Sequence, residues 1–359
     1  MLHLRAKSRN RGFAAVLAGV ALAAGAFVGA AQAWPAGPYM LPTARPVNGP
    51  LFWSIAQTWG GDAPCVQTSP LTVSDRLAPY LTSDGEKVST EVAGFQLQDQ
   101  PAEAVAAFAA LTADLSKRIK QGKAQPIVSD CHDVACAADA LFGPEAGPRL
   151  LLLATAYRFE ASDLGAEAER AWTPAELDTL LTAFGDLPAD WFPLDTKKLR
   201  VLLYRNTEAN VRMGAPPAGA TDLVAIAGEG FPGILVANGW RKLSDVERRA
   251  TIVHELGHEY ARAHHWRGSW SRAMGEDKAL ARPLNNASSV SYYADESPDE
   301  DFAESVAAYR YMPAFLKARA PARYAYLRDR VFGGQEYLAP ETCGARFPHA
   351  AGTQVADGR

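Results

Sequence analysis

The sequence predicts an α+β fold in which short strands precede a long helix that begins near residue 245. Three observations predict it. The composition is globular, with 48% of the 359 residues apolar and 21% charged, which excludes collagen-like, coiled-coil and highly charged disordered chains. No unit of about 20 to 50 residues repeats, which excludes solenoids and propellers. Short β-leaning runs lie directly before a segment with helix start signals.

Residues 1–33 have the organisation of a signal peptide. A basic region ends at Arg11, an apolar region covers 13–30, and Ala-Gln-Ala at 31–33 suits signal peptidase. We therefore expect cleavage before Trp34 and export by the Sec route to the periplasm or the medium. The alternative is an uncleaved anchor helix, because this apolar region is at the short limit of a membrane span. No second apolar run has that length, so we expect no stable membrane insertion after cleavage.

The charge balance argues against nucleic acid as a partner. The formal net charge is -4, from 36 basic and 40 acidic side chains. Four of the basic side chains lie in the signal peptide, so the mature chain keeps 32 and has a net charge of -8. Since no basic stripe stands out, we expect neither nucleic acid nor an anionic membrane surface as a partner.

The four cysteines all lie downstream of the signal peptide, and these are Cys65, Cys131, Cys136 and Cys343. An exported chain reaches an oxidising compartment, so two disulfides are expected. Pairing of Cys131 with Cys136 closes a short loop and leaves Cys65 to pair with Cys343. The alternative is a metal site that combines Cys131, His132 and Cys136.

Two helices are predicted before residue 190. The first runs from Pro101, at its first position, to Lys120 and is ended by Gly122. The second covers 174–185, where Thr173 and the glutamate three residues later form a capping box. Between them, the continuous apolar run 149–159 fits a buried strand or a helix, and both stay open.

The remaining region before residue 190 is less informative. Five prolines over 34–50 predict an extended lead-in rather than a helix or a central strand. Whether residues 34–190 form a pro-segment, a substrate-binding part or part of the core stays open. We place a second region at 191–359.

The region 191–359 begins with three β-leaning runs, at 199–204, 222–227 and 233–237. A long helix follows, capped by Ser244 with Glu247 at its third position, and it extends to about Ala263. The arrangement is α+β, with strands just upstream of a long helix.

This long helix contains the sequence His254-Glu255-Leu256-Gly257-His258. Four residues make about one helical turn, so the two imidazoles lie on one face and can converge on one zinc ion at about 2.0 to 2.1 Å. Glu255 cannot reach that ion from the same turn, but it can take a proton from a water on the metal. Gly257 leaves room beside the metal for another segment.

The alternative for this motif is a solvated helix with two exposed histidines. The apolar flanks argue against it, because a helix with Ile252, Val253, Leu256 and Tyr260 around the motif is buried. Buried histidines need partners.

A third ligand is expected from a later helix, with Ser297 as N-cap and a proline at its first position. Glu300 and Glu304 lie one turn apart on the same face of it. Such a pair suits two roles, because the first carboxylate can bind the metal and the second can accept the N–H of a ligand histidine. The alternative is an acidic surface favoured by the helix dipole.

The order and spacing of these motifs resemble those of one group of zinc metallopeptidases. His254 to His258, then Tyr293-Ala294, then Glu300-Asp301-Phe302-Ala303-Glu304, resemble the gluzincin-type zinc metallopeptidases, in particular the group that contains anthrax lethal factor and the Pro-Pro endopeptidases. That group has a Tyr-Ala pair before an E-x-F-A-E segment, with the tyrosine seven residues before the first glutamate. Asp301 stands where the group usually carries an aromatic residue, and Glu259 is charged where the extended motif prefers an uncharged one.

The resemblance implies a zincin-like fold, with a small mixed sheet packed on the HExxH helix and a mostly helical C-terminal part. It implies His254, His258 and Glu300 as ligands of one Zn²⁺ per chain. It also implies Glu255 as general base and Tyr293 as the hydroxyl that faces the reacting carbonyl. Glu304 would accept the N–H of a ligand histidine without binding the metal itself.

A rival third ligand is His264, which has the metzincin spacing after His258. That pattern needs a glycine to turn the chain out of the helix, whereas Ala261 occupies this position and favours helix. If the helix continues, His264 points away from the His258 face. We therefore prefer Glu300.

The sequence thus predicts an exported zinc metalloendopeptidase, a hydrolase that cleaves peptide or protein substrates with a zinc-activated water. The second hypothesis is a non-catalytic zinc-binding or sensor module on a peptidase-like fold. Glu255 and Tyr293 argue against that module, because metal ligation alone requires neither.

Overall fold

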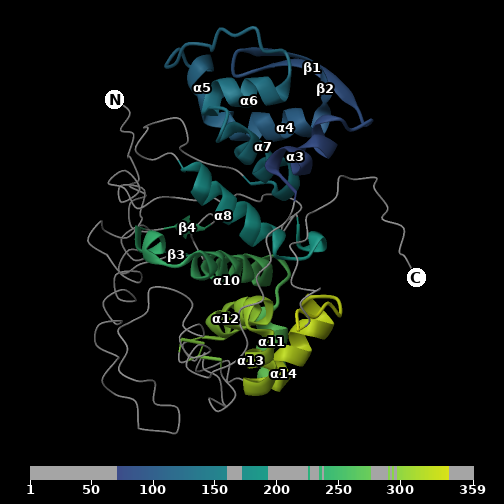
Figure 1. The fold of residues 1–359 in the computed structure, drawn as a ribbon, viewed down its shortest axis with the longest axis vertical. Coiled ribbons are helices and arrows are strands. Elements are labelled where there is room, and N and C mark those ends of the chain that lie inside the picture. The colour runs from purple at the N-terminus through teal and green to yellow at the C-terminus, as the bar shows by residue number, and fades with distance from the viewer. Residues whose placement is uncertain are drawn as a thin grey trace, which may run out of the picture.

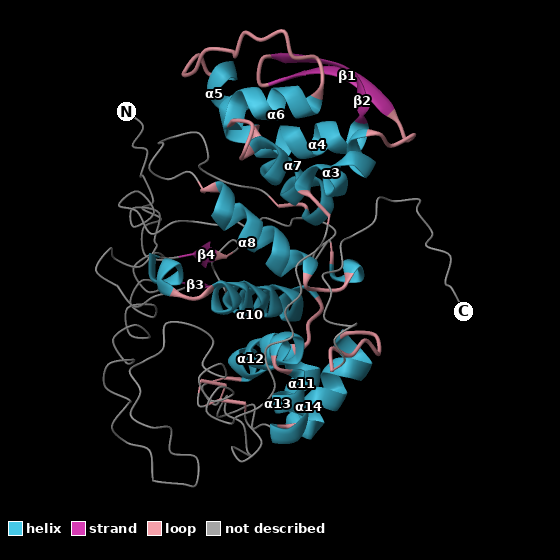
Figure 2. Cartoon of the chain, viewed as in Figure 1, coloured by secondary structure: helices cyan, strands magenta, loops and turns pink. Residues whose placement is uncertain are grey.

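The computed structural model describes residues 71–159, 172–192, 225–226, 234–236, 238–275, 290–291, 293–294 and 297–338. Over these residues the chain is mostly helical, with two antiparallel sheets of two strands each (Figure 2). This mixture of helices and small sheets agrees with the predicted α+β class. None of the described helices is both long and apolar enough to span a membrane.

The N-terminal part combines a β-hairpin with helices (Figure 1). Its elements are α3 Val73–Leu81, β1 Lys87–Val92, β2 Phe95–Pro101, α4 Ala102–Leu111, α5 Ala113–Lys120, α6 Val134–Phe142 and α7 Gly147–Tyr157. Helix α7 is almost wholly buried and contacts α3, α4 and α6. The run 149–159, for which strand and helix were both open, therefore belongs mainly to a buried helix at the centre of this part.

The hairpin was not predicted from the sequence. Its two-residue turn consists of Ala93 and Gly94, both with positive φ, at 54° and 95°, which is the signature of a type I′ turn. The apolar side of β2 packs onto α4, where the rings of Phe95 and Phe108 meet edge to face with centroids 5.8 Å apart. The alternation along β2 was a usable signal.

The helix predicted from Pro101 to Lys120 needs a correction. Pro101 is the last residue of β2, and the helix is broken into α4 and α5 at Thr112, whose backbone is not helical (φ -104°, ψ 11°). The Thr112 hydroxyl donates to the Phe108 carbonyl at 2.8 Å, but Thr155 inside the unbroken α7 forms the same bond, so this bond alone does not account for the break. Gly122 follows the end of α5 with φ 68°, as a terminating glycine does.

Cys131 and Cys136 form the expected disulfide, with Cα atoms 5.4 Å apart. Their sulfurs are bonded to each other, so the alternative metal site with His132 is wrong. The His132 Nδ1 instead lies 3.0 Å from the Gln96 carbonyl oxygen. Cys65 and Cys343 lie outside the described residues.

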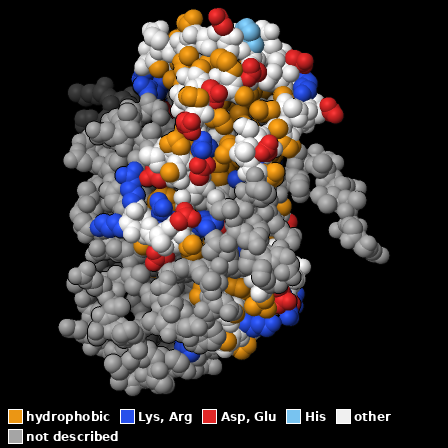
Figure 3. All heavy atoms as spheres, in the orientation of Figure 1, with side chains coloured by type: hydrophobic (Ala, Val, Ile, Leu, Met, Phe, Trp, Pro, Cys, Tyr) orange, Lys and Arg blue, Asp and Glu red, His pale blue; other side chains and the backbone are white. Residues whose placement is uncertain are grey.

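Charged side chains of both signs are interspersed over the N-terminal part on the face that Figure 3 shows, with apolar side chains visible between them. This part joins the rest of the molecule through α8, Pro174–Gly185, which contacts both α7 and α10. Arg149 of α7 donates two hydrogen bonds to Asp178 of α8, at 2.8 and 3.0 Å. Helix α8 has the predicted bounds and the predicted capping box at Thr173.

Three helices are stacked one below another in the second half of the described chain (Figure 1). They are α8, then α10 Asp245–Ala263, then α12 Pro298–Tyr311. The predicted helix from Ser244 to about Ala263 and the helix N-capped by Ser297 are both confirmed. Helix α8 lies before the predicted boundary at residues 190 and 191, whereas its partner α10 lies after it.

Shorter elements surround this stack. They are the 3-10 turns Ala189–Trp191 and Asn238–Lys242, α11 Arg267–Met274, α13 Pro313–Arg319, α14 Pro321–Tyr326 and a π turn at Leu327–Val331. Strands β3 Ala225–Ile226 and β4 Leu235–Val236 fall within two of the predicted runs, pair antiparallel, and β3 contacts α10. Among the described residues this sheet consists of these two strands alone. The run predicted at 199–204 lies outside the described residues.

Candidate metal centre

Helix α10 forms for reasons that the sequence carries locally. The Ser244 N–H donates to Glu247 at 2.9 Å, and the Glu247 N–H donates back to the Ser244 hydroxyl at 3.4 Å. The motif residues lie in the middle of the helix, where His254 and Glu255 are each 5% exposed. The alternative of two exposed histidines on a solvated helix is therefore wrong.

Helix α12 brings the acidic residues to α10, with Gly257 of α10 against Ala303 of α12. His254, His258 and Glu300 each offer one ligand atom, and these atoms all lie within 4.8 Å of one another. Nε2 of His254 lies 3.1 Å from Nε2 of His258, and each of these nitrogens lies 3.2 Å from Oε2 of Glu300. This group can hold a metal ion.

Glu304 supports the group from behind. Its side chain is fully buried, and its Oε1 lies 3.1 Å from Nδ1 of His254. A carboxylate at this distance favours the tautomer with the proton on Nδ1, which leaves the lone pair of Nε2 for a metal ion. Glu300 and Glu304 therefore approach different nitrogens of the His254 ring, Nε2 and Nδ1.

The electrostatics of the group favour a positive charge. Burial disfavours the charged form of His254, but Glu300 and Glu304 outweigh it and raise the pKa of this imidazole well above its ordinary value. Burial acts to raise the pKa of Glu300, but His258 and His254 hold it well below its ordinary value. A carboxylate that stays ionised beside two imidazoles is a suitable metal ligand.

Tyr293 and Glu255 both lie next to His254. The ring of Tyr293 stacks on the ring of His254, with centroids 6.1 Å apart and planes inclined by 24°. Glu255 is buried and directly follows His254 in α10. Both candidate catalytic side chains therefore belong to the surroundings of the ligand group. Tyr292, the neighbouring tyrosine, lies outside the described residues.

Ser291 was missed by the sequence reasoning. Its hydroxyl donates to Oε2 of Glu304 at 2.8 Å and accepts a hydrogen bond from the Ala294 N–H at 3.0 Å. A serine two residues before Tyr293 carries no motif of its own, so only the distance to Glu304 reveals it.

The two departures from the family pattern have local explanations. Asp301 is fully buried and accepts hydrogen bonds from Trp270 Nε1 at 2.9 Å and from Arg323 Nε at 2.7 Å. It therefore ties α12 to α11 and α14. Glu259 forms an ion pair with Arg262 on the same helix.

His264 does not join the ligand group among the described residues. It is the C-cap of α10, and its ring lies against Tyr260, with centroids 4.2 Å apart. The preference for Glu300 over His264 agrees with this arrangement.

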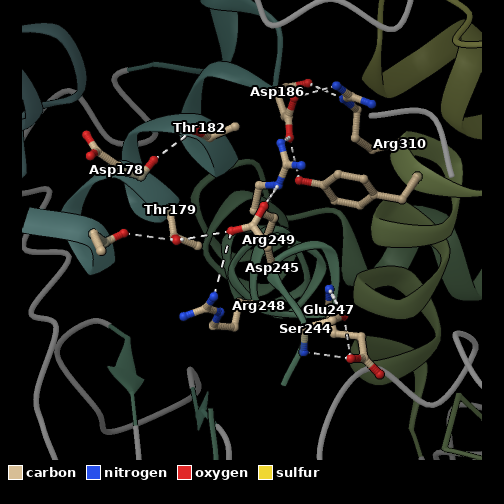
Figure 4. A network of polar contacts seen from close by, with 12 residues as sticks. Asp178, Thr179, Thr182, Asp186, Ser244, Asp245, Glu247, Arg248, Arg249 and Arg310 are labelled. Atoms are coloured by element: carbon tan, nitrogen blue, oxygen red, sulfur yellow. Dashed lines mark hydrogen bonds and ion pairs between the residues drawn. The ribbon is translucent and has the colours of Figure 1, made fainter. Parts of the chain in front are cut away.

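A buried ionic network joins the stacked helices α8, α10 and α12 (Figure 4). Asp186, just after α8, pairs with Arg310 of α12, accepts a hydrogen bond from the Tyr311 hydroxyl at 2.6 Å, and lies 3.8 Å from Nη1 of Arg249 of α10. Asp186 and Arg310 are both essentially inaccessible. The network therefore fixes the relative positions of the two helices that carry the candidate ligands.

Comparison of the chain with protein-family models, with curated proteins and with solved structures found no match. The case for a function accordingly rests on the geometry of the group around His254.

Proposed function

We propose that this chain is an exported, zinc-dependent endopeptidase that resembles the gluzincins. The observation that carries the proposal is the triangle of His254, His258 and Glu300, with Glu255 and Tyr293 beside it. Export follows from the predicted signal peptide, and the disulfide between Cys131 and Cys136 suits an oxidising compartment. Peptides or proteins are the proposed substrates.

The donor set and its dimensions fit zinc. Two imidazoles and one carboxylate leave the fourth position of a tetrahedral ion open, as a catalytic site requires. With metal–ligand bonds of about 2.0 to 2.1 Å, the ligand atoms of a tetrahedral site lie about 3.3 Å apart. The three observed separations, 3.1, 3.2 and 3.2 Å, are close to that value and nearly equal.

The chain's own residues divide the chemistry between them. A zinc ion held there would polarise the scissile carbonyl and lower the pKa of a water molecule. Glu255 accepts the proton of the attacking water and passes it to the leaving amine. The Tyr293 hydroxyl donates to the oxygen of the carbonyl as negative charge develops on it. Glu304 keeps His254 in the ligating tautomer.

The second candidate is a zinc-binding or sensor module without catalysis. It shares the ligands and the support from Glu304, but it gives no role to Glu255 or Tyr293. The stacking of Tyr293 on His254 favours the enzyme.

Glu255→Gln decides between the two candidates. We expect this variant to keep its zinc and its fold and to lose about 10² to 10⁴ in rate, because only the base is removed. The measurement is cleavage of a proteome-derived peptide library by the mature protein. Glu259→Gln is the matched control, because Glu259 is also a buried glutamate of α10 but pairs with Arg262. Equal cleavage, or no cleavage, by the wild type and Glu255→Gln would reject the peptidase.

A further inference from the structure

Ser291 contacts both Glu304 and the turn that contains Tyr293. It is 3% exposed. On one side its hydroxyl contacts Glu304 of α12, and on the other it accepts from the backbone of Ala294, next to Tyr293. One side chain thus touches both the support of the ligand His254 and the turn that carries Tyr293.

The direction of these hydrogen bonds is determined. A serine hydroxyl has one proton. The Ala294 N–H can only donate, so the Ser291 oxygen accepts there and its own proton goes to Oε2 of Glu304. The other oxygen of the same carboxylate, Oε1, is the one that lies 3.1 Å from Nδ1 of His254. The carboxylate thus accepts a hydrogen bond at one oxygen and lies at ion-pair distance from His254 at the other, and the bond from Ser291 restricts its rotation.

We propose that Ser291 is a positioning residue of the metal centre. It orients Glu304 toward His254, so that Nε2 of His254 faces the metal, and it fixes the turn that holds Tyr293 against the same imidazole. This inference rests on the metal centre of the proposed function. Ser291 acts through Glu304 and touches neither the metal nor the substrate.

The expected cost follows from what supporting residues contribute elsewhere. Loss of a residue that orients a metal ligand typically costs about 10- to 100-fold in metal affinity. Ser291→Ala removes the donor to a buried carboxylate and leaves the metal ligands in place. Its effect should therefore appear in Zn²⁺ affinity, independently of any turnover.

A double-mutant cycle separates positioning from a merely structural role. Zn²⁺ affinity is measured by competition with a chromogenic chelator for the wild type, Ser291→Ala, Glu304→Ala and the double variant. We expect Ser291→Ala to weaken Zn²⁺ binding about 10-fold or more in the wild-type background. In the Glu304→Ala background the same change should cost less than about twofold, because the contact that transmits it is gone. Equal costs in the two backgrounds, or no cost in either, would overturn the proposal.

Ser305→Ala is the matched control. Ser305 is also fully buried and follows Glu304 directly, but its hydroxyl has no hydrogen-bond partner among the described residues. We expect its Zn²⁺ affinity to equal that of the wild type. A loss as large as that of Ser291→Ala would show that any buried serine near Glu304 has this effect, and the proposal would fail.

A second pair of variants covers the case in which Ser291→Ala does not fold. Ser291→Thr and Ser291→Val have the same shape, and only threonine keeps the hydroxyl. Tighter Zn²⁺ binding by Ser291→Thr than by Ser291→Val supports the proposal, and equal binding rejects it. This test does not depend on peptidase activity. A wild type that binds Zn²⁺ but cleaves no peptide would reject the proposed function, whereas the comparison of the Ser291 variants by Zn²⁺ affinity would still be valid.

Discussion

Gly257 of α10 lies directly against Ala303 of α12, so that a Cβ built on Gly257 would lie only 3.1 Å from the Cα of Ala303. Ala303 is in the same stretch of α12 as Glu300 and Glu304. The contact therefore sets how far both carboxylates lie from the two histidines of α10. A glycine in a helix interior costs about 1 kcal/mol relative to alanine, and the close approach of the two helices accounts for it here.

Gly257→Ala tests this relationship. The added methyl meets buried backbone rather than a flexible side chain, and overpacking of this kind costs about 1 to 3 kcal/mol. Over most of this range the cost exceeds the gain of about 1 kcal/mol in helix propensity, so we expect a lower free energy of unfolding and a Zn²⁺ affinity reduced about tenfold. Denaturant unfolding with chelator and Zn²⁺ titration measure the two effects. Unchanged Zn²⁺ affinity would mean that the helix spacing does not set the ligand geometry.

The ligand assignment predicts which variants retain metal after purification. His254→Ala, His258→Ala and Glu300→Ala each remove one of three ligands, so we expect them to be nearly free of zinc. Glu304→Ala should be weakened about 10- to 100-fold but still loadable. Elemental analysis checks this, with His264→Ala as a control that keeps full stoichiometry. If Glu300→Ala retained zinc and His264→Ala lost it, the third ligand would be His264, as in the metzincin pattern.

The parts of the fold that the sequence predicted are those with local signals. The N-caps Thr173, Ser244 and Ser297 act on N–H groups within one turn, so each helix start could be placed from a few neighbouring residues. The group of His254, His258 and Glu300, which could hold a metal ion, was also expected from helical spacing and from the family resemblance. Gly257 was correctly expected to admit another segment.

The rest depended on contacts between distant residues. Asp186 and Arg310 are far apart in the sequence, and nothing near either one indicates that they pair. The break of the predicted helix at Thr112 was also not marked by any local pattern that the sequence reasoning used. Ser291 likewise became visible only when the chain placed it beside Glu304. Local patterns predict elements, whereas such contacts appear only once the elements have packed.

The expected export predicts the covalent state of the mature protein, namely its N-terminus and its disulfides. We expect the mature protein to begin at Trp34 and to contain no free thiol, which intact-mass measurement with and without alkylation checks. Cys131→Ala combined with Cys136→Ala should lower the free energy of unfolding by about 2 kcal/mol, the loop-entropy value for so short a loop. Alkylation of all four cysteines without prior reduction would contradict the two-disulfide prediction.

The ionic network predicts a large effect at Asp186. Asp186→Ala leaves the inaccessible Arg310 without its carboxylate, and loss of one partner of a buried pair costs about 3 to 5 kcal/mol. Asp178→Ala is the control, because Asp178 is half exposed and pairs with Arg149 at the surface of α8, where such pairs contribute about 0 to 1 kcal/mol. Denaturant unfolding compares the two variants. Similar losses for both would show that the network does not stabilise the helix stack.

The last prediction concerns pH, and it starts from the metal-free protein. The pKa of His254 is raised above its ordinary value of 6.5 by Glu300 and Glu304, in spite of burial. The stability that this histidine contributes is therefore complete below pH 6.5 and is lost as the pH rises through the higher, folded-state pKa. The pKa of Glu300 is lowered from 4.5, so its contribution is present above pH 4.5 and is lost as the pH falls below it. Together these two groups stabilise the metal-free protein most between pH 4.5 and 6.5.

Zinc reverses the dependence on the alkaline side, because a histidine must be neutral to bind the ion. We expect the rise in melting temperature on addition of Zn²⁺ to grow from about pH 5.5 to about pH 8, while the protein with chelator becomes less stable over the same range. His254→Gln is the control, since it removes both the titrating imidazole and a ligand. The melting temperature of this variant should not respond to Zn²⁺. With chelator present, its stability should fall less than that of the wild type as the pH rises, because the contribution of His254 is absent. If wild type and His254→Gln lost stability in parallel in chelator, His254 would not be the group responsible; if the Zn²⁺ effect were constant with pH, no histidine would release a proton on metal binding, and ligation by His254 and His258 would be refuted.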